Sequence, residues 1–134
     1  MSKVADILSE KGSHLLSIGA DAAVLDAALL MNEHQVGALV VAESGRIVGI
    51  FSERDVLRRV VAERRDPAAT RICEVMTSDV VCGTPDTPIE EARSVMKHRR
   101  IRHLPIVDEA HEVLGIISIG DLNAWRLDGQ EKTI

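Results

Sequence analysis

Two short stretches of the chain carry the same pattern of hydroxyl and carboxylate side chains. One reads GIFSERDVL, from Gly49 to Leu57, and the other reads GIISIGDLN, from Gly115 to Asn123; in both, a serine precedes an aspartate by three residues. As a helix cap, the serine accepts a hydrogen bond from the first turn, and the aspartate interacts favourably with the helix dipole. As a binding site, the free N–H groups attract a phosphate, while the carboxylate accepts hydrogen bonds from a ribose diol. The pattern alone leaves both interpretations open.

A basic segment reading KHRRIRHLP, from Lys97 to Pro105, stands out in a chain of net charge −5. Cations are favoured near the end of a helix, which explains Arg99 and Arg100 as part of a solvated basic face without any ligand. Arg102 and His103 lie past the predicted helix end, on the approach to a strand. Arginine near a helix start is typical of phosphate recognition, so this segment is a second candidate for anion binding.

The sequence contains two copies of the elements that must position these residues. A shift of 65 residues aligns Val24 with Ile89, and past the polar turn at 43–47 a shift of 66 aligns Asp55 with Asp121. Upstream of these alignments, the letters VADIL resemble the later ICEVM. Because the additional residue falls in a polar turn, two related units remain the simplest account of the chain.

Each copy predicts a short strand, an amphipathic helix, two buried strands and a closing helix. In the first copy these are 15–18, a helix from Val24, 38–41, 47–51 and 55–64; in the second they are 80–82, a helix from Ile89, 104–107, 113–117 and 121–127. Thr87, followed by Pro88 and Glu90, predicts a capping box at the start of the second copy's first helix. Half of 134 residues is too little to bury both faces of a sheet. We therefore expect an α+β fold in which two β-α-β-β-α repeats, residues 1–66 and 67–134, pack sheet to sheet with pseudo-twofold symmetry.

Composition excludes several classes of function. The chain is 46% hydrophobic and 28% charged, with one Phe and one Trp, as in a globular domain with an aliphatic core. No apolar run reaches the roughly 18 residues of a membrane span and no signal peptide is recognised, so we expect a cytoplasmic protein without a membrane partner. Cys73 and Cys82 lack CxxC spacing and are expected to be buried, reduced thiols. The motifs of hydrolases, zinc proteases and P-loop enzymes are missing from the sequence, so no catalytic residue and no metal ligand is predicted.

The sequence resembles a tandem cystathionine-β-synthase (CBS) domain pair, also called a Bateman module. The residues that carry the resemblance are VGALVV and GRIVGIFSERDVLR in the first copy, and VMTSDVV, TPDTPIEEARSVM, RRIRHLPIV and VLGIISIGDL in the second. The resemblance covers nearly the whole chain, which is similar to the small stand-alone CBS-pair proteins. No single motif is specific for this family, but the two copies in this order and at this spacing are.

The resemblance implies that adenosyl nucleotides bind in clefts between the repeats, with the ribose aspartate from one repeat and the adenine contacts from the other. It assigns the first site to Ser52, Arg54, Asp55, Thr84, Ile101, Arg102, His103 and Pro105. It assigns the second site to Ser118, Asp121, Ser17, Val36, Gly37 and Ala38. The first site has the arginine and histidine side chains and is expected to hold a phosphorylated ligand. The second has glycine and alanine at matching positions, which argues against a tight phosphate contact.

The function that this resemblance implies is a non-catalytic sensor of energy or redox state. AMP is the favoured ligand, with ATP or NAD(H) as alternatives, and the cationic first site argues against S-adenosylmethionine; no cofactor is required. Nucleotide binding is expected to favour one arrangement of the repeats and to signal to a regulated protein. A homodimer through the closing helices is expected. The alternatives are a ligand-free dimerisation module, an enzyme, and a nucleic-acid binder, the last disfavoured by the acidic charge and scarce aromatics.

Overall fold

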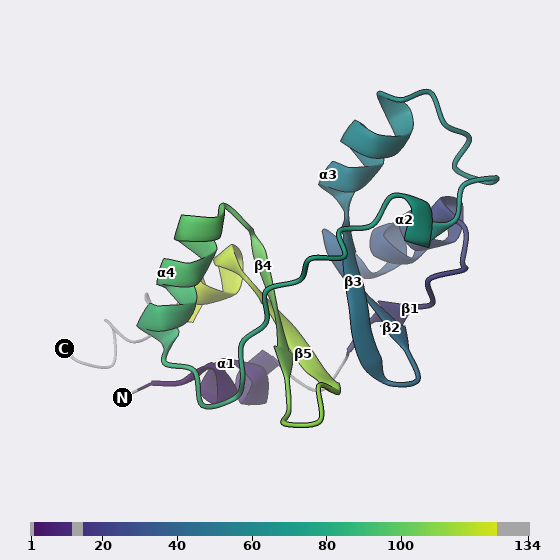
Figure 1. Cartoon of the computed structure of the whole chain (residues 1–134). Coiled ribbons are helices and arrows are strands. Elements are labelled where there is room, and N and C mark those ends of the chain that lie inside the picture. Colours follow the sequence, from purple (N-terminus) through teal and green to yellow (C-terminus); the bar gives the residue numbers. More distant parts are fainter. Residues whose placement is uncertain (1, 12–14, 126–134) are drawn as a thin grey trace. The chain divides into compact units, whose positions relative to one another are not determined.

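The computed structural model describes residues 2–11 and 15–125 of the chain. The elements are α1 (Val4–Lys11), β1 (Ser17–Ile18), α2 (Val24–His34), β2 (Ala38–Glu43), β3 (Arg46–Ser52), α3 (Glu53–Asp55), the π-helix η1 (Val56–Val61), the 3₁₀-helix η2 (Ile72–Glu74), α4 (Ile89–Arg99), β4 (His103–Val107) and β5 (Val113–Ser118) (Figure 1). Residues 119–125 are also helical. The mixture of helices and small sheets confirms the predicted α+β class.

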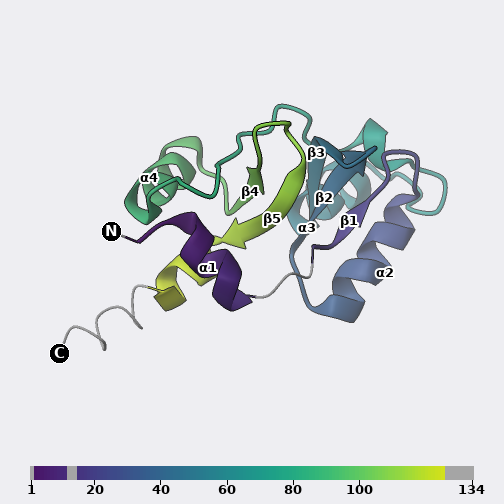
Figure 2. The same ribbon diagram turned by 90° about the horizontal axis from the view of Figure 1, so that it is seen from below.

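The strands form two separate sheets, each built around an antiparallel pair. One sheet has the order β1-β2-β3, with β1 parallel to β2, and α2 lies alongside it (Figure 2); the other consists of β4 and β5. The apolar, β-branched runs in β2 and β4 are almost entirely buried, as expected of strands covered on both faces. Ser44 and Gly45 join β2 to β3 and both have positive φ, at 54° and 79°. Such left-handed turn residues match the twist of the strands that they connect.

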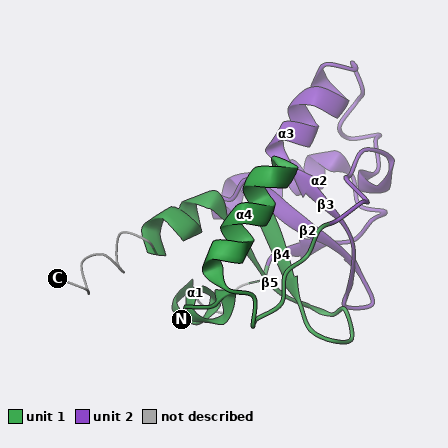
Figure 3. Ribbon diagram, turned by 60° about the vertical axis from the view of Figure 1, so that its left-hand side comes forward, with its two compact units in different colours: residues 1–15, 81–134 green, residues 16–80 purple. Residues whose placement is uncertain are grey.

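The chain divides into two compact units, each of which contains one sheet. Unit 1 comprises Met1–Leu15 and Val81–Ile134, and unit 2 comprises Leu16–Val80 (Figure 3). The two antiparallel pairs have the same register, because Ala38 pairs with Ser52 in unit 2 and His103 pairs with Ser118 in unit 1. Each pair also has a register irregularity at the equivalent place, after residue 41 and after residue 106. The duplication read from the sequence is therefore present in the backbone pairing.

The leading segment of each sequence repeat packs in the unit formed by the other repeat. The segment before α1 bonds to the start of α4, where Ile89 N donates to Ser2 O at 3.2 Å. In the same way, Val24 N at the start of α2 donates to Thr70 O at 2.9 Å. The compact units therefore differ in composition from the repeats predicted at 1–66 and 67–134, which remain a description of the sequence.

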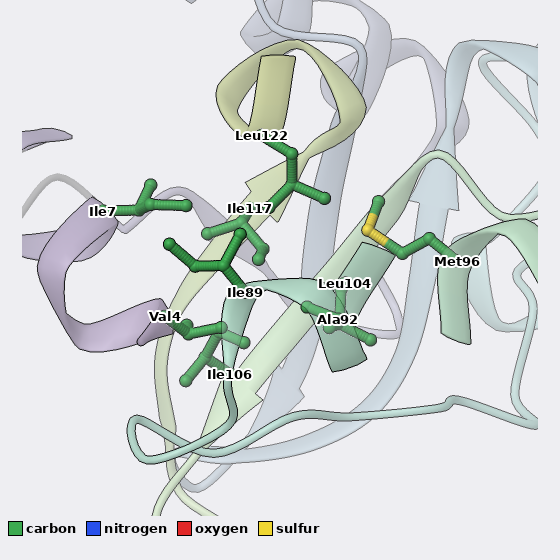
Figure 4. Packing of buried hydrophobic residues seen from close by; sticks show 9 residues of the cluster. All are labelled: Val4, Ile7, Ile89, Ala92, Met96, Leu104, Ile106, Ile117 and Leu122. Carbon is green, nitrogen blue, oxygen red and sulfur yellow. The ribbon is translucent and has the colours of Figure 1, made fainter. Parts of the chain in front are cut away.

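The two hydrophobic cores show the same exchange. Val4 and Ile7 of α1 point into the core of unit 1, toward Ile106, Ile117 and their neighbours (Figure 4). The remaining members of this core are Ile89, Ala92, Met96, Leu104 and Leu122. The core of unit 2 is built from Val24, Ala27, Met31, Leu39, Val41, Phe51, Val60, Ile72 and Val75, of which the last two come from the segment that precedes the second copy. Each unit therefore buries its helices and sheet only with the help of the exchanged segment.

Several local predictions were wrong. Residues 80–82 do not form a strand, since the chain pairs with β4 only at Gly83, which donates to Pro105 O and accepts from Val107 N. The expected strand at 15–18 is reduced to two residues. The N-cap of α4 is Pro88, with no side-chain cap, because the Thr87 hydroxyl instead accepts from Thr84 N.

The closing helices also differ from the prediction. The first begins at Glu53 and continues as a π-helix that ends at Val61, before the expected 64. The second begins at 119, and its expected end at 127 lies outside the described residues. Trp125 is half-buried and packs on the core of unit 1. Cys73 is exposed, against the expectation of a buried thiol, whereas Cys82 is half-buried and its pKa is raised by burial.

The two glycines of the repeated phrase provide a matched test of this packing. A Cβ added to Gly49 would meet Met76 Sδ at 2.6 Å and the backbone Thr77 O at 3.0 Å, whereas the three nearest atoms to one added to Gly115 all belong to the Leu8 side chain, the closest at 2.8 Å. We expect Gly49→Ala to lower the free energy of unfolding by about 1–3 kcal/mol, because the backbone cannot move aside cheaply.

Gly115→Ala serves as the control, since the end of the Leu8 side chain can rotate away, and a smaller loss of stability is expected. Urea unfolding of both variants measures the difference. Equal losses, or a larger loss for Gly115→Ala, would contradict the packing of the exchanged segments against β3 and β5.

Candidate functional site

Ser52 and Asp55 form a capping box at the junction of β3 and α3. Ser52 N donates to Asp55 Oδ2 at 3.0 Å, and Asp55 N donates to Ser52 Oγ at 3.3 Å. The Ser52 hydroxyl also donates to Asp55 Oδ2 at 3.2 Å. The aspartate is 8% exposed and is one of the few buried polar residues of the described chain. The helix-cap interpretation of the repeated phrase is therefore confirmed here, and it places a carboxylate at the start of a helix.

Ser118 and Asp121 repeat this geometry at the end of β5. Ser118 N donates to Asp121 Oδ2 at 2.8 Å, and Asp121 N donates to Ser118 Oγ at 3.1 Å. The Asp121 side chain is 24% exposed. Both copies of the phrase therefore build the same structure, in which a serine cap and an aspartate lie side by side where a strand becomes a helix.

Each cap lies against the segment that leads into the neighbouring strand of its own unit. Glu53 N donates to Gly37 O in unit 2, and Ile119 N donates to Arg102 O in unit 1, both at 3.0 Å. The cap is thus fixed beside residues 36–38 in one unit and beside residues 101–103 in the other. Hydroxyl, carboxylate and strand-entry residues are brought together within each unit.

The predicted site residues are distributed evenly between the units. Unit 2 contains Ser17, Val36, Gly37, Ala38, Ser52, Arg54 and Asp55; unit 1 contains Thr84, Ile101, Arg102, His103, Pro105, Ser118 and Asp121. Each unit therefore holds a part of each predicted site. The pairing of half-sites that the family resemblance implies stays a prediction.

The cationic side chains of the predicted first site are placed for access by solvent. Arg54 and Arg102 are exposed, and His103 is half-buried as the first residue of β4. The basic residues Lys97 and Arg99 lie in the last turn of α4, where the helix dipole favours them. The basic segment therefore has both a structural explanation and two exposed or partly exposed groups beyond the helix.

Arg59 was missed by the analysis of the sequence. Its Nε lies 3.6 Å from Asp55 Oδ1, and its guanidinium donates to Val75 O and Met76 O at 3.2 and 3.1 Å. The side chain thus links the capping carboxylate to the exchanged segment that packs on unit 2. The four-residue spacing from Asp55 along a helix could have suggested this pair.

Lys11 was also missed, and it is the cation that contacts the second carboxylate. Lys11 Nζ lies 2.8 Å from Asp121 Oδ2 and donates to Ile116 O at 2.7 Å. Burial raises the pKa of Asp121, but the hydrogen bonds from Lys11 and Ser118 outweigh it and hold the pKa below its ordinary value. No local pattern points to this pair, because 110 residues separate its members.

An open groove of about 520 Å³ lies within unit 2, between α2 and the first closing helix. Its lining includes Met31 and Val36 on one side and Val56, Leu57 and Val61 on the other. The Leu57 and Val61 side chains are exposed to 61% and 60%. The lining also includes the polar side chains of Asn32, Gln35 and Glu53 but no cation, so this groove is not suited to a phosphate.

Two structural searches bear on other classes of site. Across residues 2–11 and 15–125, no three His, Cys, Asp or Glu side chains are grouped as metal ligands. In the same part of the chain, no helix combines the length and the apolar character needed to cross a membrane.

Comparison with known proteins identifies the family. The family model for the CBS domain matches residues 4–62 and 72–128. The CBS domain-containing protein YhcV of Bacillus subtilis is 36% identical over 122 residues, covering 91% of this chain and 84% of that protein. A solved structure of a protein with CBS domains from Burkholderia ambifaria is 37% identical and has a TM-score of 0.90, with 96% of each chain covered. The protein described here belongs to the CBS-domain family and contains a pair of CBS domains.

Two solved relatives contain ligands. The CBS domain protein PAE2072 from Pyrobaculum aerophilum, complexed with AMP, is 26% identical with a TM-score of 0.81, covering 90% of this chain and 89% of that one. The CBS domain pair of protein MJ0100, in complex with 5′-methylthioadenosine and S-adenosyl-L-methionine, is 25% identical with a TM-score of 0.84, covering 97% and 98%. Both neighbours thus bind adenosine derivatives.

The Lys11–Asp121 pair predicts a dependence of stability on pH. Asp121→Asn keeps an acceptor for Ser118 N but leaves Lys11 without its charged partner, so we expect a loss of about 1 kcal/mol in the free energy of unfolding at pH 7. The folded-state pKa of Asp121 lies below the ordinary value of 3.8. The stabilisation is therefore present above that value and is lost as the pH falls through the lower folded-state pKa.

Urea unfolding of wild type and Asp121→Asn between pH 2.5 and pH 7 measures this effect. The difference between the two proteins should be constant near neutral pH and should vanish in acid. Asp86→Asn is a suitable control, because its side chain is 91% exposed and lies 3.8 Å from Lys3. A pH-independent difference for Asp121→Asn would show that the ion pair does not contribute.

Proposed function

We propose that this protein is a non-catalytic regulatory module that binds an adenosyl nucleotide and reports its level to a protein partner. The observation that carries the proposal is the pair of serine–aspartate caps, each held against the strand-entry segment of its own unit. A carboxylate at this position can accept hydrogen bonds from a ribose diol, and the neighbouring N–H groups can favour an anion. The ligands named for two solved relatives, AMP and S-adenosyl-L-methionine with 5′-methylthioadenosine, share the adenosine that such a site would bind.

The first site is assigned the phosphorylated ligand. Asp55 is proposed to bind the ribose, with Arg54 and Arg102 as the groups that neutralise phosphate and His103 beside the adenine. The two arginine side chains favour AMP, ATP or NAD(H) over S-adenosyl-L-methionine, which carries a positive sulfonium. AMP is the ligand that we favour, because it has a single phosphate group for the two arginines to contact.

We propose that ligand binding is transmitted through a protein–protein contact surface on the module. Leu29 on α2 and Leu57 and Val61 on η1 are exposed to between 59% and 61%, which is unusual for aliphatic side chains. Apolar surface of this kind is typical of protein–protein contacts, and a second copy of the chain is the proposed occupant. The cytoplasm is the proposed location, and a regulated protein is the proposed receiver of the signal.

The nucleotide site is tested by isothermal titration with AMP, ATP and NADH. AMP is expected to bind the wild-type protein and to raise its melting temperature. Asp55→Asn preserves the cap but removes the charge that accepts from ribose, and Arg102→Ala removes a phosphate contact. Each substitution should weaken AMP binding by about 10- to 100-fold, the effect of losing one charged hydrogen bond.

Arg99→Ala is the matched control, because Arg99 is exposed in the same basic segment but is explained by the end of α4. It should leave the affinity for AMP nearly unchanged. Melting curves establish that each variant is folded. If no adenosine compound binds the wild type at millimolar concentration, the caps are structural only, and a ligand-free dimerisation module becomes the better account.

A further inference from the structure

The Lys11 ammonium is hydrogen-bonded to the carboxylate of the second serine–aspartate cap, which is Asp121. Asp121 Oδ2 accepts from Lys11 Nζ at 2.8 Å and from Ser118 N at 2.8 Å. A carboxylate oxygen has two lone-pair sites, so both sites of this atom are used. A ribose diol that donates to both oxygens of Asp121 must therefore displace the ammonium or share the atom with it.

In unit 2, a backbone N–H group makes the hydrogen bond that corresponds to one of the Lys11 hydrogen bonds. Ile50 corresponds to Ile116 in the repeat, and its carbonyl accepts from Thr77 N at 3.0 Å, whereas Ile116 O accepts from Lys11 Nζ at 2.7 Å. A backbone N–H in one unit is thus replaced by a lysine side chain in the other. The replacement follows from local structure, since α1 remains helical through Lys11 while the segment at 77–79 does not form a helix.

The alignment of the two leading segments is fixed by packing. Leu8 lies against Gly115 and Met76 lies against Gly49, so the segments correspond with a shift of 68 residues. Lys11 then matches Asp79, which has the opposite charge. The lysine is consequently a feature of one unit only.

Asp55 and Asp121 also differ in where the contacting cation comes from. Arg59 approaches Asp55 Oδ1 at 3.6 Å, from the helix that follows the cap. The residue at the matching position of the second copy is Trp125, and the cation at Asp121 arrives instead from α1, at 2.8 Å. A charged contact of 2.8 Å is a charge-assisted hydrogen bond, and it uses the same oxygen as the cap. Oδ2 of each carboxylate accepts two hydrogen bonds, from Ser52 N and Oγ at Asp55 and from Ser118 N and Lys11 Nζ at Asp121. The second carboxylate therefore differs in that one of its donors is a cation from outside the cap.

We propose that Lys11 is a specificity-determining residue of the second site, where it competes with ribose for Asp121 and keeps that site weak for adenosine compounds. The inference rests on the proposed function, since it takes Asp121 as a ribose-binding group. The proposal explains the expected difference in adenosine affinity between the two sites by the Lys11–Asp121 contact, which is present in unit 1 only. Because the lysine is 39% exposed and the aspartate 24% exposed, the cost of displacing the ammonium is modest, and a three- to tenfold effect on affinity is expected.

Adenosine is the probe, because it presents ribose without a phosphate. Titrations use the full chain with Asp55→Asn, which weakens the first site, alone and combined with Lys11→Met or Lys11→Arg. Lys11→Met keeps the length of the side chain but removes the charge, and should tighten adenosine binding about three- to tenfold. Lys11→Arg retains a cation and should leave the affinity near that of the Asp55→Asn protein. Adding Asp121→Asn to Lys11→Met should abolish the gain.

A second readout does not depend on any ligand. The Asp121 carboxyl, followed by carbon NMR during an acid titration, should have a higher pKa in Lys11→Met than in the wild type or in Lys11→Arg. An unchanged titration of Asp121, or unchanged adenosine affinity in Lys11→Met, overturns the inference. If AMP still binds the wild type in that case, the proposed function stands without it. If neither AMP nor adenosine binds any form of the protein, both are overturned.

Discussion

The exchange of leading segments is the constraint on which both units depend. A unit of this size cannot cover both faces of its sheet with the helices of one repeat. Val4 and Ile72 complete the two cores, and both are fully buried. Each comes from the segment that precedes the other repeat along the chain. Neither repeat therefore has a complete core of its own, and the duplication must be maintained as a pair.

The same exchange sets the environment of the candidate site residues. The leading segments pack against β3 and β5, the strands that end in the serine–aspartate caps. Each segment thereby reaches the carboxylate of its cap: one accepts hydrogen bonds from Arg59 through Val75 O and Met76 O, and the other supplies Lys11 directly. The two units therefore have nearly the same backbone, but their Asp55 and Asp121 carboxylates have different partners. The backbones match because both depend on the same strand register and apolar packing. The cations at the two carboxylates differ because single residues on the leading segments differ.

The sequence predicted the features that follow from periodicity and from short-range spacing. The four long strands, the helices from Val24 and Ile89, and the caps at Ser52 and Ser118 were all readable from apolar runs and three-residue intervals. The strand at 80–82 was wrong because an apolar run does not reveal how many residues find a pairing partner. The exchange of segments and the Lys11–Asp121 pair were not predicted, since they join residues from 27 positions apart, at Gly49 and Met76, to 110 positions apart, at Lys11 and Asp121, and no local pattern encodes such contacts.

The unequal carboxylates bear on how a paired module can act as a sensor. Two identical sites would respond to one ligand over one concentration range, whereas sites that differ in their competing cations respond over two. Lys11 is the last residue of α1, and α1 belongs to the first repeat in sequence but to the second in packing. A ligand that displaced Lys11 from Asp121, as proposed, would therefore change a contact made by the first repeat within the unit of the second. In such a design the exchange that completes the cores also couples ligand binding in one repeat to the chain of the other.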